Sequence, residues 1–149
     1  MPIAIKNSKV DITSEKLTKE LAKKFTKYLI GGEFIFLYGE MGVGKTTFVK
    51  YFINELQKLN NLPQTEITSP TFSLLNEYQV KDIRIKHYDL FRINRREDTN
   101  SLDLFEKDNK LITLIEWPQL IADMHDVKSI NLTFSYLNDL NDRSVDIKV

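Results

Sequence analysis

Apolar and polar residues follow helical spacing, then strand spacing, through the first part of the chain. Hydrophobic side chains recur at steps of three and four over residues 14–30, which predicts an amphipathic helix that stops at Gly31-Gly32. Residues 34–38 form an uninterrupted apolar run that is typical of a buried strand. Helical spacing returns over residues 48–56, so a second helix is expected directly after a glycine-rich segment.

The second part of the chain has mostly strand patterns. Two extended stretches separated by Lys81-Asp82 predict a hairpin, and residues 95–109 predict a short helix flanked by mobile loop. The strands expected in this part are residues 73–80, 83–90, 111–115, 129–137 and 144–149. The pattern favours an α/β fold whose mixed sheet has a parallel core, antiparallel edge strands and flanking helices. We expect residues 1–149 to form one domain.

The segment between the first expected strand and the second expected helix carries the clearest chemistry. Residues 39–46 have the sequence GEMGVGKT, which matches the pattern G-x-x-x-x-G-K-[ST] of a phosphate-binding loop. Gly39 and Gly44 allow the tight turn that aims backbone N–H groups at phosphate oxygens, and Lys45 adds a positive charge beside the β and γ phosphates. The Thr46 hydroxyl is then placed to ligate Mg²⁺. Strand, loop and helix in this order predict a P-loop NTPase fold.

The charge balance argues against a protein that holds nucleic acid by itself. Lysine and arginine total 21, as do aspartate and glutamate, so no general positive field attracts a polyanion. The absence of cysteine excludes disulfides, thiolate metal sites and a thiol nucleophile. The first ten residues are mixed and charged, and no apolar run is long enough to span a membrane. We therefore expect a cytoplasmic protein that binds neither a membrane nor DNA.

Two carboxylates are candidates for the acidic group that Mg²⁺-dependent hydrolysis needs. Glu116 follows the apolar run 111–115 and Asp89 follows residues 83–88, so each is expected at the carboxyl edge of a strand, where α/β sheets bind ligands. We expect Lys45, Glu116 and Asp89 to be the catalytic residues. The sequence leaves open which carboxylate is the main metal ligand, and a surface carboxylate or a helix cap is the alternative for either.

Four sequence blocks together resemble one family. They are GEMGVGKTTF at residues 39–48, SPTFSL at 69–74, HYDLFR at 87–92 and LIEWP at 114–118. In this order and spacing they are similar to the blocks of the TsaE family, also called YjeE. The resemblance implies a small ATPase that acts in forming threonylcarbamoyladenosine beside the tRNA anticodon, with ATP and Mg²⁺ as cofactors. It also implies TsaB and TsaD as protein partners that bind the tRNA, so that tRNA is reached only through them.

The resemblance also implies roles for single residues. Thr46, Glu116 and Asp89 would be the Mg²⁺ ligands, with Asp89 acting directly or through water. Ser69, Pro70 and Thr71 would form a switch segment near the γ-phosphate, although a turn entering a strand is the alternative. The phosphate-binding positions that it implies are Gly42, Val43, Gly44, Lys45, Thr46 and Thr47.

Further positions admit two interpretations or depart from the family. Trp117 resembles the family tryptophan beside the site, or is an ordinary core aromatic. Ser14, with Thr13, would approach the adenine in the family pattern but equally fits a helix N-cap. Phe91 stands where the family usually has tyrosine, which removes a hydroxyl. His87 is assigned no role, because a strand histidine is commonly structural.

The phosphate loop and the resemblance favour an ATPase whose nucleotide state switches its association with TsaB and TsaD. Two alternatives stay open. A small-molecule kinase could use Asp89 with Arg92, Arg95 and Arg96 around an acceptor. A nucleotide-dependent scaffold would bind partners without meaningful turnover. A GTPase is disfavoured, because Asn109-Lys110 is followed by two apolar residues and so does not complete the guanine-binding pattern Asn-Lys-x-Asp.

Overall fold

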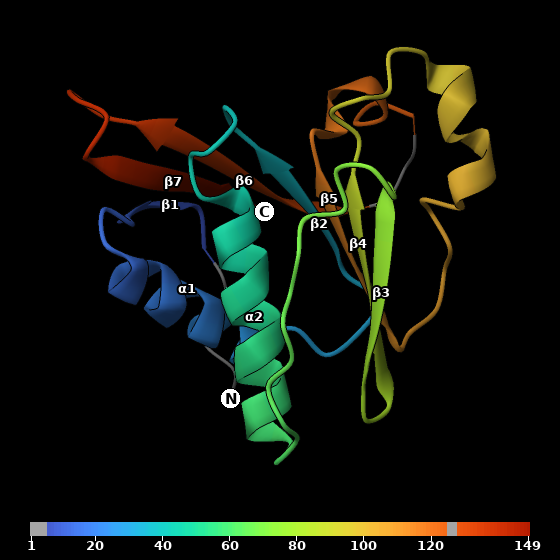
Figure 1. Cartoon of the computed structure of the whole chain (residues 1–149), viewed down its shortest axis with the longest axis horizontal. Helices are drawn as coiled ribbons and strands as arrows, with labels where there is room; N and C mark the ends of the chain where they lie inside the picture. The colour runs from blue at the N-terminus through green and yellow to red at the C-terminus, as the bar shows by residue number, and fades with distance from the viewer. Residues whose placement is uncertain (1–5, 125–127) are drawn as a thin grey trace.

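Seven strands form one sheet in the computed structural model, which describes residues 6–124 and 128–149 (Figure 1). The first five residues of the charged N-terminal stretch lie outside these ranges. The strands are β1 (Ser8–Asp11), β2 (Phe34–Tyr38), β3 (Leu75–Val80), β4 (Ile83–Asp89), β5 (Leu111–Glu116), β6 (Ser129–Tyr136) and β7 (Arg143–Lys148). Their order across the sheet is β1-β7-β6-β2-β5-β4-β3, so strands that are distant in the sequence lie side by side.

The centre of the sheet is parallel and its edges are antiparallel. β2 pairs in parallel with β5 and β6, and β4 pairs in parallel with β5. β3 joins β4 as an antiparallel hairpin, in which Val80 lies opposite Ile83 around the predicted turn at Lys81-Asp82. At the other edge, β7 and β1 continue the sheet in antiparallel pairing. This arrangement confirms the predicted mixed α/β sheet.

The edge strand β1 is not predicted by the sequence pattern. Three of its four residues are exposed, so no apolar alternation marks it. Its backbone pairs with β7, where Val10 lies opposite Val145. When an edge strand is stabilised by pairing with a segment far away in the sequence, its own residues carry only a weak strand signal.

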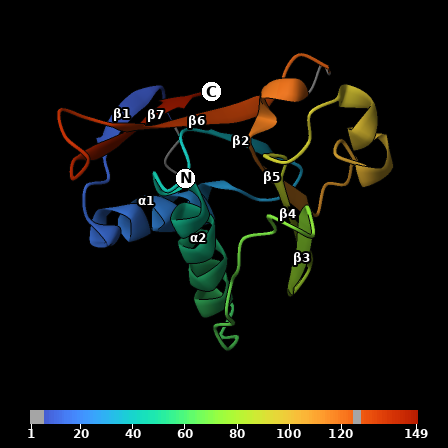
Figure 2. The same ribbon diagram turned by 45° about the horizontal axis from the view of Figure 1, so that its top comes forward.

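Two helices cover one face of the sheet (Figure 2). They are α1 (Glu15–Tyr28) and α2 (Lys45–Leu59), and both confirm the predicted helices. The Ser14 hydroxyl caps α1 by accepting a hydrogen bond from the backbone N–H of Leu17. Phe25 of α1 meets Phe48 of α2 edge-on, with ring centroids 5.2 Å apart. The two helices therefore reach the sheet as one packed layer.

A second core lies on the opposite face of the sheet. It includes side chains next to two short 3-10 helices, η1 (Arg96–Leu102) and η2 (Pro118–Leu120). Leu37 of β2 belongs to the helix-side core, whereas Phe36 belongs to this second core. The Tyr88 hydroxyl donates to the backbone oxygen of Leu102 at 2.6 Å and so ties η1 to β4. The short helix expected within residues 95–109 is thus a 3-10 helix.

No helix in the described ranges combines the length and the apolar character that crossing a membrane requires.

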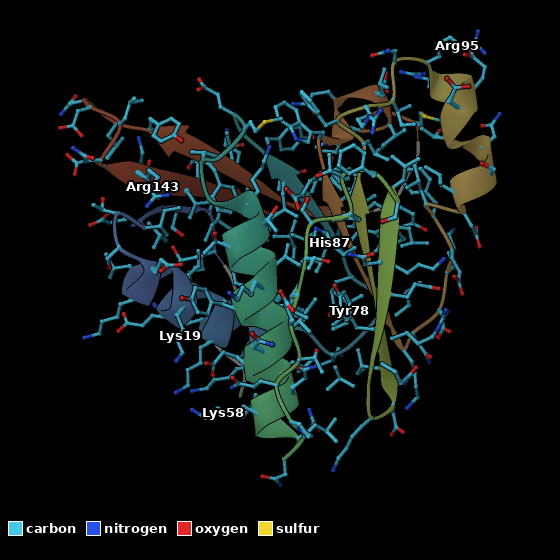
Figure 3. All side chains as sticks on the ribbon, in the orientation of Figure 1. Lys19, Lys58, Tyr78, His87, Arg95 and Arg143 are labelled. Atoms are coloured by element: carbon cyan, nitrogen blue, oxygen red, sulfur yellow. The ribbon has the colours of Figure 1, made fainter. Side chains whose placement is uncertain are left out.

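Side-chain alternation in β4 and β5 brings three polar groups to the face that α2 covers, and Figure 3 labels one of them, His87. Ile85 and Leu114 belong to the helix-side core, and residues two apart on a strand share a face. His87 and Asp89 therefore face α2 from β4, as Glu116 does from β5. The parallel register places Asp89 directly opposite Glu116. The carboxyl edge of the central strands thus carries two acidic groups close to the start of α2.

Candidate nucleotide-binding site

Three glycines set the path of the loop between β2 and α2. Gly39, Gly42 and Gly44 have φ values of +143°, +79° and +121°, in a region that residues with side chains rarely adopt. A Cβ atom on Gly39 would also lie only 2.7 Å from the backbone oxygen of Phe134. Val43 is completely buried and anchors the loop in the core. The observed loop therefore needs Gly39 and Gly44 of the phosphate-loop pattern, and also Gly42 between them.

The loop forms one wall of a cleft of about 230 Å³ at the carboxyl edge of the sheet. The other walls come from the segment before β3, from the end of β4 and from the residues that end and follow β5. The predicted site residues that line the cleft are Gly42, Gly44, Lys45, Thr46, Thr47, Thr71, Asp89 and Glu116. Val43 and Ser14 are not among the lining residues. Residues that are far apart in the sequence therefore converge at one cleft.

The Thr46 hydroxyl, in the first turn of α2, lies against the Glu116 carboxylate. Its Oγ1 is 3.1 Å from Oε1 and 3.0 Å from Oε2, and the hydroxyl donates to the carboxylate. Nε2 of His87 lies 2.6 Å from Oε2 of the same carboxylate. Glu116 is only 2% exposed, so these contacts are shielded from water. Two of the positions expected to hold Mg²⁺ are thus in direct contact.

Asp89, opposite Glu116, holds the segment that precedes β3. Its Oδ1 accepts a hydrogen bond from the backbone N–H of Phe91 at 2.9 Å, and its Oδ2 lies 3.4 Å from the hydroxyls of Ser69 and Thr71. These two hydroxyls are 2.8 Å from each other. The segment before β3 therefore forms a turn that enters a strand, which is the alternative to a switch segment. Its hydroxyls also line the cleft.

Lys45 is buried between the phosphate loop and Trp117. Its ammonium group donates to the backbone oxygen of Gly39 and lies 3.6 Å from the centre of the indole ring. Burial lowers the pKa of Lys45, while the negative charges of Glu116 and Asp89 act in the opposite direction. Two carboxylates and an aromatic face thus surround a cation at the cleft.

Trp117 both lines the cleft and packs against the second core, so each of its two interpretations applies. Its backbone is left-handed, with a φ of +57°, which is uncommon for a large side chain. The backbone N–H of Trp117 donates to the oxygen of Leu37 at 3.2 Å, which ties the chain after β5 to β2. The Phe91 ring packs 4.8 Å from the indole ring. The strained turn therefore places the indole beside Lys45.

The polar groups of the cleft suit magnesium. In residues 6–124 and 128–149, no group of three or more histidine, cysteine, aspartate or glutamate side chains could hold a metal ion by itself. Mg²⁺ commonly takes one or two carboxylates from a protein and further oxygens from substrate phosphates. Thr46, Glu116 and Asp89 offer hard oxygen donors at the phosphate loop, so they fit a Mg²⁺ ion that binds together with a nucleotide.

Comparison with known proteins decides the family. The family described as "Threonylcarbamoyl adenosine biosynthesis protein TsaE" matches residues 12–145. The chain belongs to the TsaE family. It is 36% identical over 137 residues to the "tRNA threonylcarbamoyladenosine biosynthesis protein TsaE" of Rickettsia bellii, an alignment that covers 89% of this chain and 90% of that protein. The protein of the same name from Bacillus subtilis is 30% identical over 106 residues, which cover 71% of this chain and 63% of that protein.

A solved structure has a similar fold. The crystal structure of Bacillus subtilis YdiB is similar to this chain with a TM-score of 0.71, covering 97% of this chain and 86% of that one at 22% identity. The family resemblance and the predicted P-loop fold are both confirmed.

Two positions implied by the TsaE resemblance do not line the described cleft, namely Val43, which is buried in the core, and Ser14. Ser14 is occupied as the cap of α1. Its neighbour Thr13 accepts a hydrogen bond from the backbone N–H of Arg143 at 3.2 Å, and the Arg143 guanidinium lies close to Gly44. An approach of Ser14 to adenine therefore stays a prediction.

The arginines that a kinase could use do not line the cleft in the described ranges. The Arg92 guanidinium lies 4.8 Å from the centre of the exposed Phe72 ring, and Arg96 donates to Asp123 at 2.6 Å. Arg95 lies at the outer edge of the molecule (Figure 3). In this TsaE-family chain, the kinase alternative therefore has no support from the placement of these arginines.

Some cleft residues were not selected from the sequence. The structure adds Met41 and Phe91 to the lining, and it places His87 directly against Glu116. A signal for His87 existed, because it precedes Asp89 by two positions on an expected strand and so shares its face. Loop residues such as Met41 have no comparable periodicity, so only the structure could place them.

Proposed function

We propose that this chain is a Mg²⁺-dependent ATPase that acts with TsaB and TsaD in forming threonylcarbamoyladenosine in tRNA. The observation that carries the proposal is the contact between Thr46 and Glu116, at 3.0 and 3.1 Å, where the phosphate loop enters α2. In P-loop enzymes a threonine or serine hydroxyl and an acidic residue hold the metal that bridges the phosphates. Two such groups in contact from different elements support a preformed magnesium site.

Each polar group of the cleft has a task in this proposal. Backbone N–H groups of residues 42–47 donate to the phosphates at the start of α2, and Lys45 adds its ammonium group. Thr46 and Glu116 hold Mg²⁺, which supplies charge neutralisation at the phosphates when it is bound. Asp89 contributes to the metal shell directly or through water. Thr71 donates toward the γ-phosphate, which links the nucleotide to the segment before β3.

The partners enter the proposal through the family. Relatives of this chain carry the name "tRNA threonylcarbamoyladenosine biosynthesis protein TsaE". We infer that hydrolysis resets the assembly with TsaB and TsaD, which carry the tRNA and the transfer chemistry. The balance of 21 basic and 21 acidic residues supports tRNA contact through these partners instead of direct binding. Action in the cytoplasm as one domain is part of the same proposal.

The experiment separates ATP binding from ATP hydrolysis. E116Q removes the acidic group while it keeps the size of the side chain, so we expect ATP to bind and kcat to fall about 100-fold or more. E66Q makes the same change at an exposed residue and should behave as wild type. Full ATP turnover by E116Q would show that the catalytic assignment is wrong.

A further inference from the structure

His87 is completely buried behind the cleft, between β4 and α2 (Figure 3). It lies two residues before Asp89 on β4 and opposite Leu114 of β5, so its ring is on the same face of the sheet as Glu116. The distance from its Nε2 to Oε2 of Glu116 is 2.6 Å. A candidate metal ligand is therefore contacted by a side chain that does not itself line the cleft.

The other ring nitrogen identifies the tautomer of His87. Nδ1 is buried and has no hydrogen-bond partner in the part of the chain that the structure describes. A proton on Nδ1 would leave a buried N–H without an acceptor, which is unfavourable. The favoured tautomer therefore has its proton on Nε2, and this N–H donates to Glu116.

This tautomer gives the two oxygens of Glu116 different surroundings. Oε2 accepts from His87 and also lies 3.0 Å from the Thr46 hydroxyl. Among the described side chains, Oε1 has its hydrogen-bonding contact with Thr46 alone, at 3.1 Å. Because rotation of the carboxylate would break a buried hydrogen bond to His87, Oε1 stays presented to Thr46 and the cleft.

We propose that His87 is a positioning residue whose Nε2–H fixes the Glu116 carboxylate in the orientation that holds Mg²⁺ beside Thr46. This role rests on the proposed function, since it has meaning only if Glu116 is a metal ligand. Partners that orient a metal ligand commonly change metal affinity or activity about 10- to 100-fold when they are replaced. A histidine that only fills space has no such selective effect on magnesium.

Two variants of similar polarity separate positioning from packing. In H87Q the amide nitrogen takes a place near that of Nε2 and can still donate to Glu116. In H87N the shorter side chain ends near the place of Nδ1 and does not reach the carboxylate. Both variants bury a neutral amide, so a difference between them reports the hydrogen bond to Glu116.

The first readout is ATP affinity, measured by calorimetry in Mg²⁺ and again in EDTA. We expect H87N to weaken ATP binding about 10-fold in Mg²⁺ and less than about twofold in EDTA, while H87Q stays within about threefold of wild type in both. Equal behaviour of H87N and H87Q, or an equal loss in both buffers, overturns the positioning role alone. Wild-type ATP binding that ignores Mg²⁺ overturns the magnesium part of the proposed function and this role with it.

The second readout needs neither nucleotide nor metal, and no variant has to fold. Long-range ¹⁵N–¹H spectra of the imidazole rings in the wild-type protein show which nitrogen of His87 carries the proton. We expect the Nε2–H tautomer. A proton on Nδ1 overturns the proposal, whatever the affinities of the variants.

Discussion

Replacing Thr46 by valine tests the contact on which the candidate site depends. T46V keeps the β-branched shape of the side chain in the first turn of α2 and removes only the hydroxyl. Of the hydrogen bonds that described side chains give to Glu116, only the one from His87 would remain. The variant therefore isolates one hydrogen bond to a buried carboxylate.

The expected loss of stability follows from the number of protons that the hydroxyl can donate. Thr46 has one such proton, so its contacts of 3.0 and 3.1 Å to the two oxygens count as one hydrogen bond. Glu116 is 2% exposed, so water does not replace the lost donor. A hydrogen bond to a charged group contributes about 1.5–3 kcal/mol. We expect T46V to lower the free energy of unfolding by this amount, which corresponds to a fall in Tm of roughly 3–12 °C.

T47V is the matched control for this measurement. Thr47 is the next residue of α2 and is likewise partly exposed, and its hydroxyl makes no hydrogen bond with the described residues. We expect T47V to change stability by less than about 0.5 kcal/mol. Urea unfolding of both variants in nucleotide-free buffer with EDTA, followed by circular dichroism, gives the comparison. Equal stabilities of T46V and T47V refute the reasoning.

K45A is expected to weaken ATP binding about 10- to 100-fold in calorimetry because the loop loses its cation, and unchanged affinity would contradict the phosphate-loop assignment. G31A is expected to melt at a lower temperature than G32A, because both carry backbone strain of about 1–3 kcal/mol but only a Cβ on Gly31 collides with the loop before β5. Hydrogen bonds, the largest from Lys86, lower the pKa of Glu106 in the folded protein. The stabilising effect of Glu106 is therefore complete above the ordinary pKa of glutamate and is lost as pH falls through the lower folded-state pKa. The stability gap between wild type and E106Q in urea unfolding should therefore shrink as the buffer is acidified below the ordinary pKa. A constant gap would show that Glu106 contributes no such effect.

The predicted parts of the fold are those whose signals are local. The glycine pair at Gly31 follows closely on the end of α1 at Tyr28, and the glycines of the phosphate loop separate β2 from α2, so both boundaries have a signal in the adjacent sequence. Strand β1 has no such local signal, because its pairing partner β7 comes from the other end of the chain. Pairing between distant segments is decided by the assembled sheet and not by either segment alone.

In the candidate site, too, some features have a local signal in the sequence and others do not. Thr46, Glu116 and Asp89 could each be selected because each stands where a strand ends or a helix begins. Their mutual contacts depend on the β4–β5 register and on the depth at which α2 packs, and no sequence motif specifies the register or the packing depth. For Trp117 the left-handed backbone turn that sets its indole beside the loop has no signal in the sequence. For Ser14 a cap and a ligand contact require the same residue type, so the sequence could not separate them.

The rate of ATP hydrolysis by the purified chain, measured in Mg²⁺ alone and with the TsaB and TsaD proteins of its own host, tests the central claim most directly. We predict slow hydrolysis that rises when the pair is added and that is lost in E116Q under both conditions. Hydrolysis that ignores the pair, or that persists in E116Q, would contradict a partner-driven ATPase with Glu116 at its magnesium site.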